Sequence, residues 1–346
     1  MFLKKLLPLL GVLLSINTLG AAGNEIPSPF YLWGGSGTTI PIGVTNITLP
    51  EGTPKDPSYT FISSSYDQEL AYSGFIDGIN GVTLTLDGLV NFFDDPGYQE
   101  DELIEAPHLL RLRDGNPLYH GMVFPLLGNK ENDVVINVSP NDITTYFTVG
   151  DAVDILQANT IGGLLGTGEN FTGLAGKSNQ GDNLMIWTTY GWKTYFYYQD
   201  KWQTFGSRND QSATIVYPDE GLVYIRRSGA LTVSFSGSVP FTVQSYRPGS
   251  DAKFLMSNPF PIPATLSQLI DTSSNWMSGT ILDEIDQVLF WSGTAWQAYY
   301  HNGSDWINLT TSEIDDKEVE GGEAFFIVRA ANDSLTAGYS KINIPQ

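Results

Sequence analysis

The sequence has no cysteine and only three histidines among 346 residues. The absence of cysteine excludes disulfides, thiolate zinc sites, cysteine nucleophiles and acyl-cysteine lipid anchors. Three histidines in unlike contexts supply little imidazole for acid–base chemistry. Beyond the first residues, every apolar run is broken well before the roughly 18 residues that a membrane-spanning helix needs. We therefore expect a fold that hydrophobic packing holds together without covalent cross-links.

Basic residues are also scarce. The chain has 17 Lys and Arg against 38 Asp and Glu, which gives a formal net charge of −21. This charge repels phosphate backbones and anionic lipid, so we expect no nucleic-acid partner. The composition is 41% hydrophobic and 12% aromatic, which is too apolar for a disordered chain. The sequence therefore predicts a folded, acidic protein.

The N-terminus follows the pattern of a secretory signal. Lys4 and Lys5 precede a short apolar stretch at 6–14, and small residues follow at 20–22. We predict a cleaved signal peptide at 1–22 and no membrane insertion after cleavage. The expected location is extracytoplasmic, which includes secreted, periplasmic and cell-surface proteins.

In the rest of the chain, turn-forming residues separate short apolar runs, a pattern typical of antiparallel sheets. Short runs of β-branched and apolar residues at 82–86, 222–226 and 324–328 alternate with turns rich in Gly, Asn, Asp and Pro. Helical patterns are confined to 159–165 and 264–270. We predict an all-β protein of antiparallel barrels or sandwiches with very little helix.

An internal repeat is the sharpest signal. Residues 182–187 (DNLMIW) align with residues 286–291 (DQVLFW), and the same register places Trp192 on Trp296 and Trp202 on Trp306. Residues 222–227 align with 324–329 after a shift of two positions. We therefore predict two tandem homologous β units at 142–240 and 241–346, preceded by an N-terminal β domain at 23–141.

Aromatic side chains crowd both predicted units. Flat rings on a rigid β surface can stack on sugars, while nearby polar groups bind the hydroxyls. Packing of most of these rings in the core is the alternative. The predicted ligand platforms are Trp192, Trp202, Trp296 and Trp306, which follow turns in the sequence.

Asp182 and Asp286 begin the two aligned segments. A carboxylate beside loop carbonyls can bind Ca²⁺, so these residues are the predicted metal ligands, and no other cofactor is expected. The alternative is that each aspartate ends a turn by bonding its own backbone. No catalytic residue is predicted, because the sequence has no G-x-S-x-G motif and its many acids single out no pair for glycoside hydrolysis.

The order of motifs supports one resemblance. It comprises an N-terminal signal, residues 73–79 (SGFIDGI), 149–151 (VGD), 257–261 (SNPFP), and the two Asp–Trp blocks. In this order the chain resembles a family of secreted proteins, without an assigned activity, that is common in verrucomicrobial bacteria. The resemblance implies an extracytoplasmic all-β protein with two related C-terminal units, and it supplies no catalytic residue.

These observations favour a secreted or cell-surface protein with a structural or adhesive function and no catalytic activity. Its duplicated aromatic units would contact a glycan or another surface protein. The first alternative is a carbohydrate-binding protein that uses exposed tryptophans. A glycoside hydrolase with paired carboxylates is the second.

Overall fold

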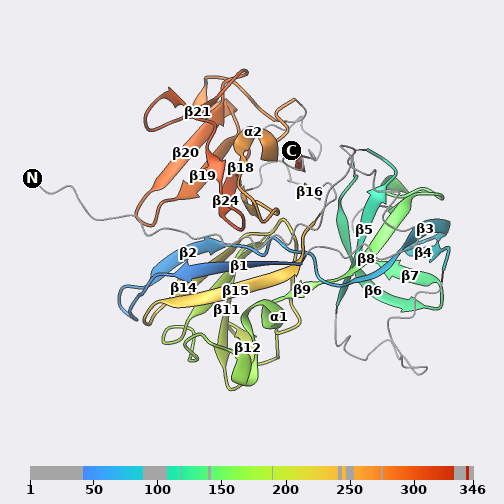
Figure 1. The fold of residues 1–346 in the computed structure, drawn as a ribbon, viewed down its shortest axis with the longest axis horizontal. Coiled ribbons are helices and arrows are strands. Elements are labelled where there is room, and N and C mark those ends of the chain that lie inside the picture. Colours follow the sequence, from blue (N-terminus) through green and yellow to red (C-terminus); the bar gives the residue numbers. More distant parts are fainter. Residues whose placement is uncertain are drawn as a thin grey trace, which may run out of the picture.

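The computed structural model describes residues 42–88, 107–117, 119–138, 142–188, 190–240, 244–246, 253–273, 276–330 and 340–342. The predicted signal peptide at 1–22 lies outside these ranges. Within them the chain is all-β, as predicted, and its two α-helices are short: α1 (Ile161–Leu165) and α2 (Leu266–Leu269). Figure 1 shows a barrel at the right and two sheet-containing parts stacked at the left.

The barrel is closed by six antiparallel strands in the order β3-β4-β7-β6-β5-β8. Their bounds are β3 (Leu70–Asn80), β4 (Thr83–Leu86), β5 (His108–Asp114), β6 (Val123–Lys130), β7 (Asp133–Ile136) and β8 (Ala152–Gln157). Gly81 turns the chain between β3 and β4 with φ of 61°, a left-handed conformation that glycine adopts without strain. The strand predicted at 82–86 is β4, Thr83–Leu86.

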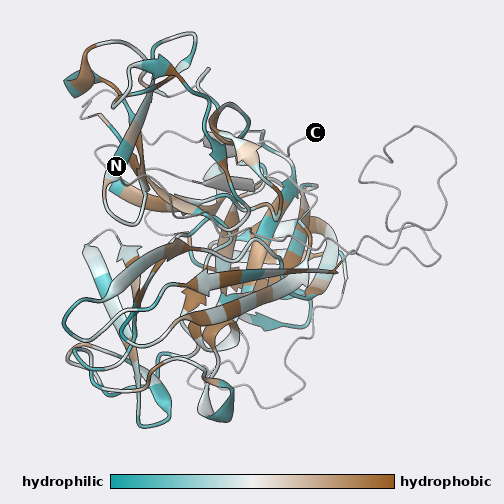
Figure 2. Cartoon of the chain, turned by 60° about the vertical axis from the view of Figure 1, so that its left-hand side comes forward, coloured by the Kyte–Doolittle hydropathy of each residue, from teal (hydrophilic) through white to brown (hydrophobic). Residues whose placement is uncertain are grey.

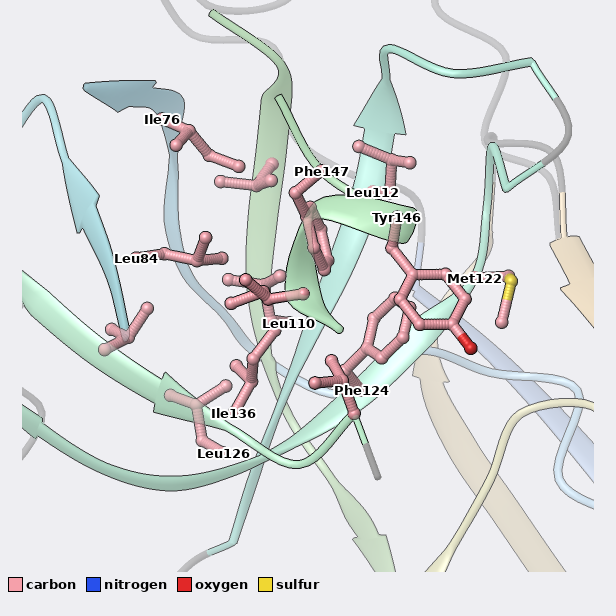
Figure 3. Packing of buried hydrophobic residues seen from close by; sticks show 14 of the residues in the cluster. Ile76, Leu84, Leu110, Leu112, Met122, Phe124, Leu126, Ile136, Tyr146 and Phe147 are labelled. Carbon is pink, nitrogen blue, oxygen red and sulfur yellow. The ribbon is translucent and has the colours of Figure 1, made fainter. Parts of the chain in front are cut away.

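Side chains fill the barrel, so it has a packed core. Alternate residues of β4 and β7 point inward, and Leu84, Leu86, Val134 and Ile136 are almost completely buried. Rings from the segment after β7 close one end, where Phe124 of β6 lies 5.0 Å from the ring centres of Tyr146 and Phe147. Figure 3 shows these rings beside the aliphatic layer.

The first sheet outside the barrel has five strands in the order β12-β11-β10-β14-β2. Their bounds are β2 (Ser58–Ile62), β10 (Asn183–Thr188), β11 (Gly191–Tyr198), β12 (Lys201–Thr204) and β14 (Leu222–Arg226). A two-stranded ribbon of β1 (Ile42–Leu49) and β15 (Leu231–Ser238) contributes to the core on one face of this sheet, together with α1. A short pair, β9 (Asn159–Thr160) and β13 (Ile215–Val216), completes this part.

The second sheet has six strands in the order β17-β24-β19-β20-β21-β22. Their bounds are β17 (Lys253–Ser257), β19 (Gln287–Trp291), β20 (Trp296–His301), β21 (Trp306–Asn308), β22 (Glu313–Ile314) and β24 (Ala324–Val328). The short pair β18 (Ala264–Thr265) and β23 (Glu318–Val319) lies beside α2. A further pair consists of β16 (Gln244–Tyr246) and β25 (Ser340–Ile342).

The two sheets pack against each other through a shared apolar layer. Val223 and Ile225 of β14 meet Leu255, Ala324 and Phe326 of the second sheet in one buried cluster. Because β14 also covers the core on its other face, all five of its residues are buried. Figure 2 shows apolar colour concentrated along the strands and polar colour toward the loops.

Strand pairing crosses the predicted limit at residue 142. By its place in the chain, β8 corresponds to β17, because β8 precedes β9 and β17 precedes β18. β8 nevertheless pairs with β3 and β5 of the barrel. In the first sheet, β2 occupies the edge and pairs with β14. In the second sheet, β17 occupies the matching edge and pairs with β24. The barrel and the first sheet are therefore interleaved along the chain, and the four domain ranges stay a prediction.

Candidate functional site

Four tryptophans meet where the two sheets face each other. Trp187 lies opposite Trp192 at the end of hairpin β10–β11, with ring centroids 5.0 Å apart. Trp291 lies opposite Trp296 at the end of hairpin β19–β20, with ring centroids 5.2 Å apart. Cross-strand aromatic pairs of this kind stabilise the ends of hairpins.

The second tryptophan of each hairpin contacts the same phenylalanine. The Phe326 ring of β24 lies 5.5 Å from Trp192 and 5.7 Å from Trp296, and both contacts are edge to face. Phe61 of β2 adds an edge contact to Trp296 at 5.4 Å. We call Trp192, Trp296 and Phe326 the indole rim. Edge-to-face packing fixes the orientation of these rings.

Both indoles of the rim keep substantial contact with solvent. Trp192 is 39% exposed and Trp296 is 45% exposed, whereas Phe326 between them is buried. The sequence had singled out both tryptophans as ligand platforms, and the structure brings these two together. An open aromatic surface of this kind on a rigid sheet is suited to stacking on a flat apolar partner.

The other two predicted platforms are buried, so that prediction is wrong for them. Trp202 and Trp306 are 1% and 2% exposed. The Trp202 indole Nε1–H donates to the carbonyl oxygen of Gly166 at 3.0 Å, and Trp306 packs against the rings of Trp276 and His301. Each belongs to the core on the outer face of its own sheet, and neither can stack on a ligand from solvent.

Asp182 is buried and its carboxylate is saturated by protein donors. Oδ1 accepts from the Arg227 backbone N–H at 2.8 Å. Oδ2 accepts from the Leu174 N–H at 2.9 Å, from the Tyr224 hydroxyl at 3.0 Å and from the Arg226 guanidinium. Burial raises the pKa of the Tyr224 hydroxyl, and the Asp182 charge adds to that shift, so Tyr224 remains a donor.

Asp286 is bound by the same kinds of donor. Oδ1 accepts from the Ala330 N–H at 2.7 Å, and Oδ2 accepts from the Met277 N–H at 2.9 Å. Arg329 lies 3.0 Å from Oδ2 as a buried ion pair. Donors surround both aspartates where a cation ligand would present free oxygens, so the predicted role as calcium ligands is not supported. In the described part of the chain, no cluster of three or more His, Asp or Glu could hold a metal.

Two further carboxyls, which the sequence analysis missed, lie in the turn before β14. Loss of hydration raises the pKa of the Glu220 carboxyl from 4.5 to about 8 and that of Asp219 from 3.8 to about 6. Glu220 Oε2 accepts from the Tyr217 N–H at 3.2 Å. This turn bonds to β17, because Ser257 N–H donates to the Asp219 carbonyl oxygen at 3.2 Å. The two acids therefore lie where the two sheets meet.

Protonation of Glu220 should couple folding to pH. A carboxyl whose pKa is raised by folding stabilises the folded state below its unfolded pKa of 4.5, and this contribution is lost as the pH rises through about 8. We expect Glu220→Gln to retain the acceptor for Tyr217 and to be more stable than the wild type by roughly 3 kcal/mol above pH 8. Near pH 4.5 the two proteins should be almost equal in stability.

Urea unfolding across this pH range measures the difference. Glu313→Gln is the control, because Glu313 is exposed and its replacement removes the same formal charge. If the two variants respond to pH alike, general charge repulsion and not burial of Glu220 governs the effect.

Comparison with protein families, curated proteins and solved structures gives no match to this chain. The site must therefore be interpreted from its own geometry. None of the helices in the described residues has the length and apolar character to cross a membrane.

Proposed function

We propose that this chain is a secreted or cell-surface protein with a structural or adhesive function, without catalytic activity, which makes contacts through its aromatic β units. The observation that carries the proposal is the indole rim. Two large rings from different sheets are held edge-on against Phe326 while 39% and 45% of their surface remains exposed. A preoriented aromatic surface loses little side-chain freedom when it binds.

We further propose that the two sheets descend from a tandem duplication. The matched pattern of contacts supports it: Trp187 pairs with Trp192 as Trp291 pairs with Trp296. Each leading aspartate also accepts from an arginine and from the next backbone amide: Arg226 and Arg227 for Asp182, Arg329 and Ala330 for Asp286. Strand pairing places Tyr224 opposite Leu184 and Ile327 opposite Val288, so these positions correspond one residue away from the alignment of 222–227 with 324–329. On this proposal each copy contributes one indole to the rim, so duplication itself created the two-ring surface.

Carbohydrate binding is the second candidate function. The half-exposed pair Trp192 and Trp296 favours it, because indole faces stack on the apolar faces of sugar rings. It differs from adhesion to a protein only in the partner, so one experiment with two kinds of surface separates the candidates.

The double variant Trp192→Ala, Trp296→Ala tests both candidates. We expect its retention on the surface that binds wild type to fall by roughly tenfold or more, because both exposed rings are lost. Retention is measured on a panel of immobilised polysaccharides and on immobilised cell-envelope protein. The matched control is Phe205→Ala, which removes an 83% exposed ring in the turn after β12.

Retention of the double variant at the wild-type level on every surface would overturn the role of the indole rim. Binding only to polysaccharide selects the carbohydrate-binding candidate. Release of new reducing ends from the same polysaccharides would contradict the proposal that the protein lacks catalytic activity.

A further inference from the structure

A groove runs between helix α1 and strand β15, on the face of the first sheet that lies opposite the indole rim. It consists of two adjoining depressions of about 190 and 460 Å³, which share Gly163, Leu164 and Ser234 in their walls. β15 contributes five consecutive residues to it, Thr232 through Ser236, and no residue of β1 lines it. The groove therefore follows the edge of β15 that faces away from β1. Figure 1 shows β1 and α1 on opposite sides of β15.

The direction of the backbone groups on this edge follows from one pair of hydrogen bonds. Ser238 N–H donates to the Asp67 carbonyl at 2.7 Å, and Asp67 N–H donates to the Ser238 carbonyl at 2.9 Å. Ser238 thus bonds away from β1, although Ile42 of β1 lies opposite it. Backbone groups alternate between the two edges of an antiparallel strand, so Ser236, Ser234 and Thr232 also point into the groove.

This edge is only partly used by the protein. Gln68 Nε2 donates to the Ser236 carbonyl at 3.2 Å and to Asn159 Oδ1 at 2.7 Å, which closes the end of the edge next to Asp67. Thr232 and Ser234 make no backbone hydrogen bond with any residue in the described ranges. An unpaired N–H and C=O at strand spacing are a template for one more strand.

The opposite wall leaves room for a backbone. Gly162, Gly163 and Gly166 contribute no side chain to it. Gly162 and Gly166 are fixed by packing, since a Cβ there would meet the Ser212 side chain and the Asn170 carbonyl oxygen, respectively. This wall therefore presents backbone atoms of the three glycines to a ligand in the groove.

The chemistry of the walls selects among ligands. The lining residues include no Asp, Glu, Lys or Arg, and the single aromatic residue among them, Phe235, is 1% exposed. A charged ligand finds no counter-charge, and a sugar finds no ring on which to stack. The remaining groups are backbone donors and acceptors, hydroxyls and amides, together with aliphatic side chains such as Leu164 and Leu165, which match an uncharged polypeptide strand.

We propose that this groove binds an extended, uncharged peptide segment of another protein, which adds as a third strand to the free edge of β15. The mode is β-strand addition, in which main-chain hydrogen bonds give affinity and alternate side chains give specificity. This site is separate from the indole rim, so its test is independent of the function proposed above.

The probe is a capped octapeptide with the sequence of β1, IGVTNITL, because β15 already accepts this uncharged strand on its other edge. Hydrogen exchange is measured on the full chain with and without the probe. We expect the amides of Thr232 and Ser234 to exchange quickly in the free protein and to become protected by the probe. Val233 and Phe235, whose amides face β1, should be protected in both cases.

Ser234→Pro removes one free N–H, and it breaks no backbone hydrogen bond to β1, because the Ser234 amide faces the groove. We expect it to weaken probe binding by roughly tenfold, since about 1.4 kcal/mol of hydrogen bonding is lost. Ser234→Ala is the matched control: both variants lose the Ser234 hydroxyl bond to Asn46, and only the proline loses the amide. Ser234→Ala should bind within about twofold of wild type.

Four results overturn the proposal. The first is a folded wild-type protein that does not bind the probe, and the second is equal binding by the proline and alanine variants. The third is protection of Thr232 and Ser234 that rises with protein concentration alone, which identifies a second copy of this chain as the occupant. Protection by a neutral oligosaccharide in place of the peptide would assign the groove to sugars and overturn the proposal as well.

Discussion

Asp182→Asn and Asp286→Asn should each destabilise the protein by about 3–5 kcal/mol, because each leaves a buried arginine without its counter-charge. Asp182 and Asp286 are 2% and 0% exposed, and their partners Arg226 and Arg329 are buried too. The asparagine NH₂ group would also face backbone N–H groups that now donate to a carboxylate oxygen. An unpaired buried guanidinium is more unfavourable than the loss of an exposed ion pair.

Urea unfolding of the single variants measures these losses, with Asp283→Asn as the control. Asp283 lies three residues before Asp286 and is exposed, so its variant should remain within about 0.5 kcal/mol of wild type. Replacing both partners, Asp286→Asn with Arg329→Met, should recover part of the loss. A loss for Asp286→Asn no larger than that of the control would contradict a structural role for the buried pair.

Trp202→Ala and Trp306→Ala should destabilise the fold by about 3–5 kcal/mol each, because both leave large cavities in packed cores. The two phenylalanine variants should differ. Trp202→Phe also leaves the Gly166 carbonyl oxygen without its donor, whereas Trp306 Nε1–H has no acceptor among the described residues. We expect Trp202→Phe to be the less stable of the two by about 1 kcal/mol.

Thermal and urea unfolding of the four variants check these values, and Trp192→Ala is the comparison. Its ring is 39% exposed and contacts Trp187 and Phe326 by edges, so we expect a loss of about 1–2 kcal/mol. If Trp192→Ala were as destabilising as Trp202→Ala, the rim would be core, and its proposed role in binding would lose its basis.

The positions of several strands are predicted by local sequence patterns. Residues 222–226 and 324–328 were predicted as strands and form β14 and β24 within those limits. The two short helices lie within the ranges predicted for them, 159–165 and 264–270. In the structure, local hydrogen bonds begin them: Thr160 Oγ1 accepts from the Gly163 N–H, and the Gln268 side chain accepts from the Thr265 N–H. These features depend on neighbours in the chain, which the sequence displays directly.

The sequence does not predict which individual tryptophans are buried. Trp202 and Trp306 follow turns in the sequence, as Trp192 and Trp296 do, so the sequence pattern does not distinguish the four. In the structure Trp202 and Trp306 cover the outer cores of their sheets, while Trp192 and Trp296 lie at the edge of the layer between the sheets. A strand has two faces, and which face meets solvent depends on what packs against the sheet.

The amino-acid order by itself determined the all-β class, the antiparallel strands and short helices, and the matched positions of Asp182 with Asp286 and of Trp192 with Trp296. Only the tertiary structure decided that β8 joins the barrel while β2 takes the edge beside β14, that both aspartates face arginines, and that Thr232 and Ser234 of β15 have no backbone partner among the described residues. The physical reason is the distance along the chain over which each interaction acts. Alternation and turn chemistry act over a few residues. Strand partners and ion pairs form between segments that are dozens to hundreds of residues apart, and the packing of whole sheets selects them.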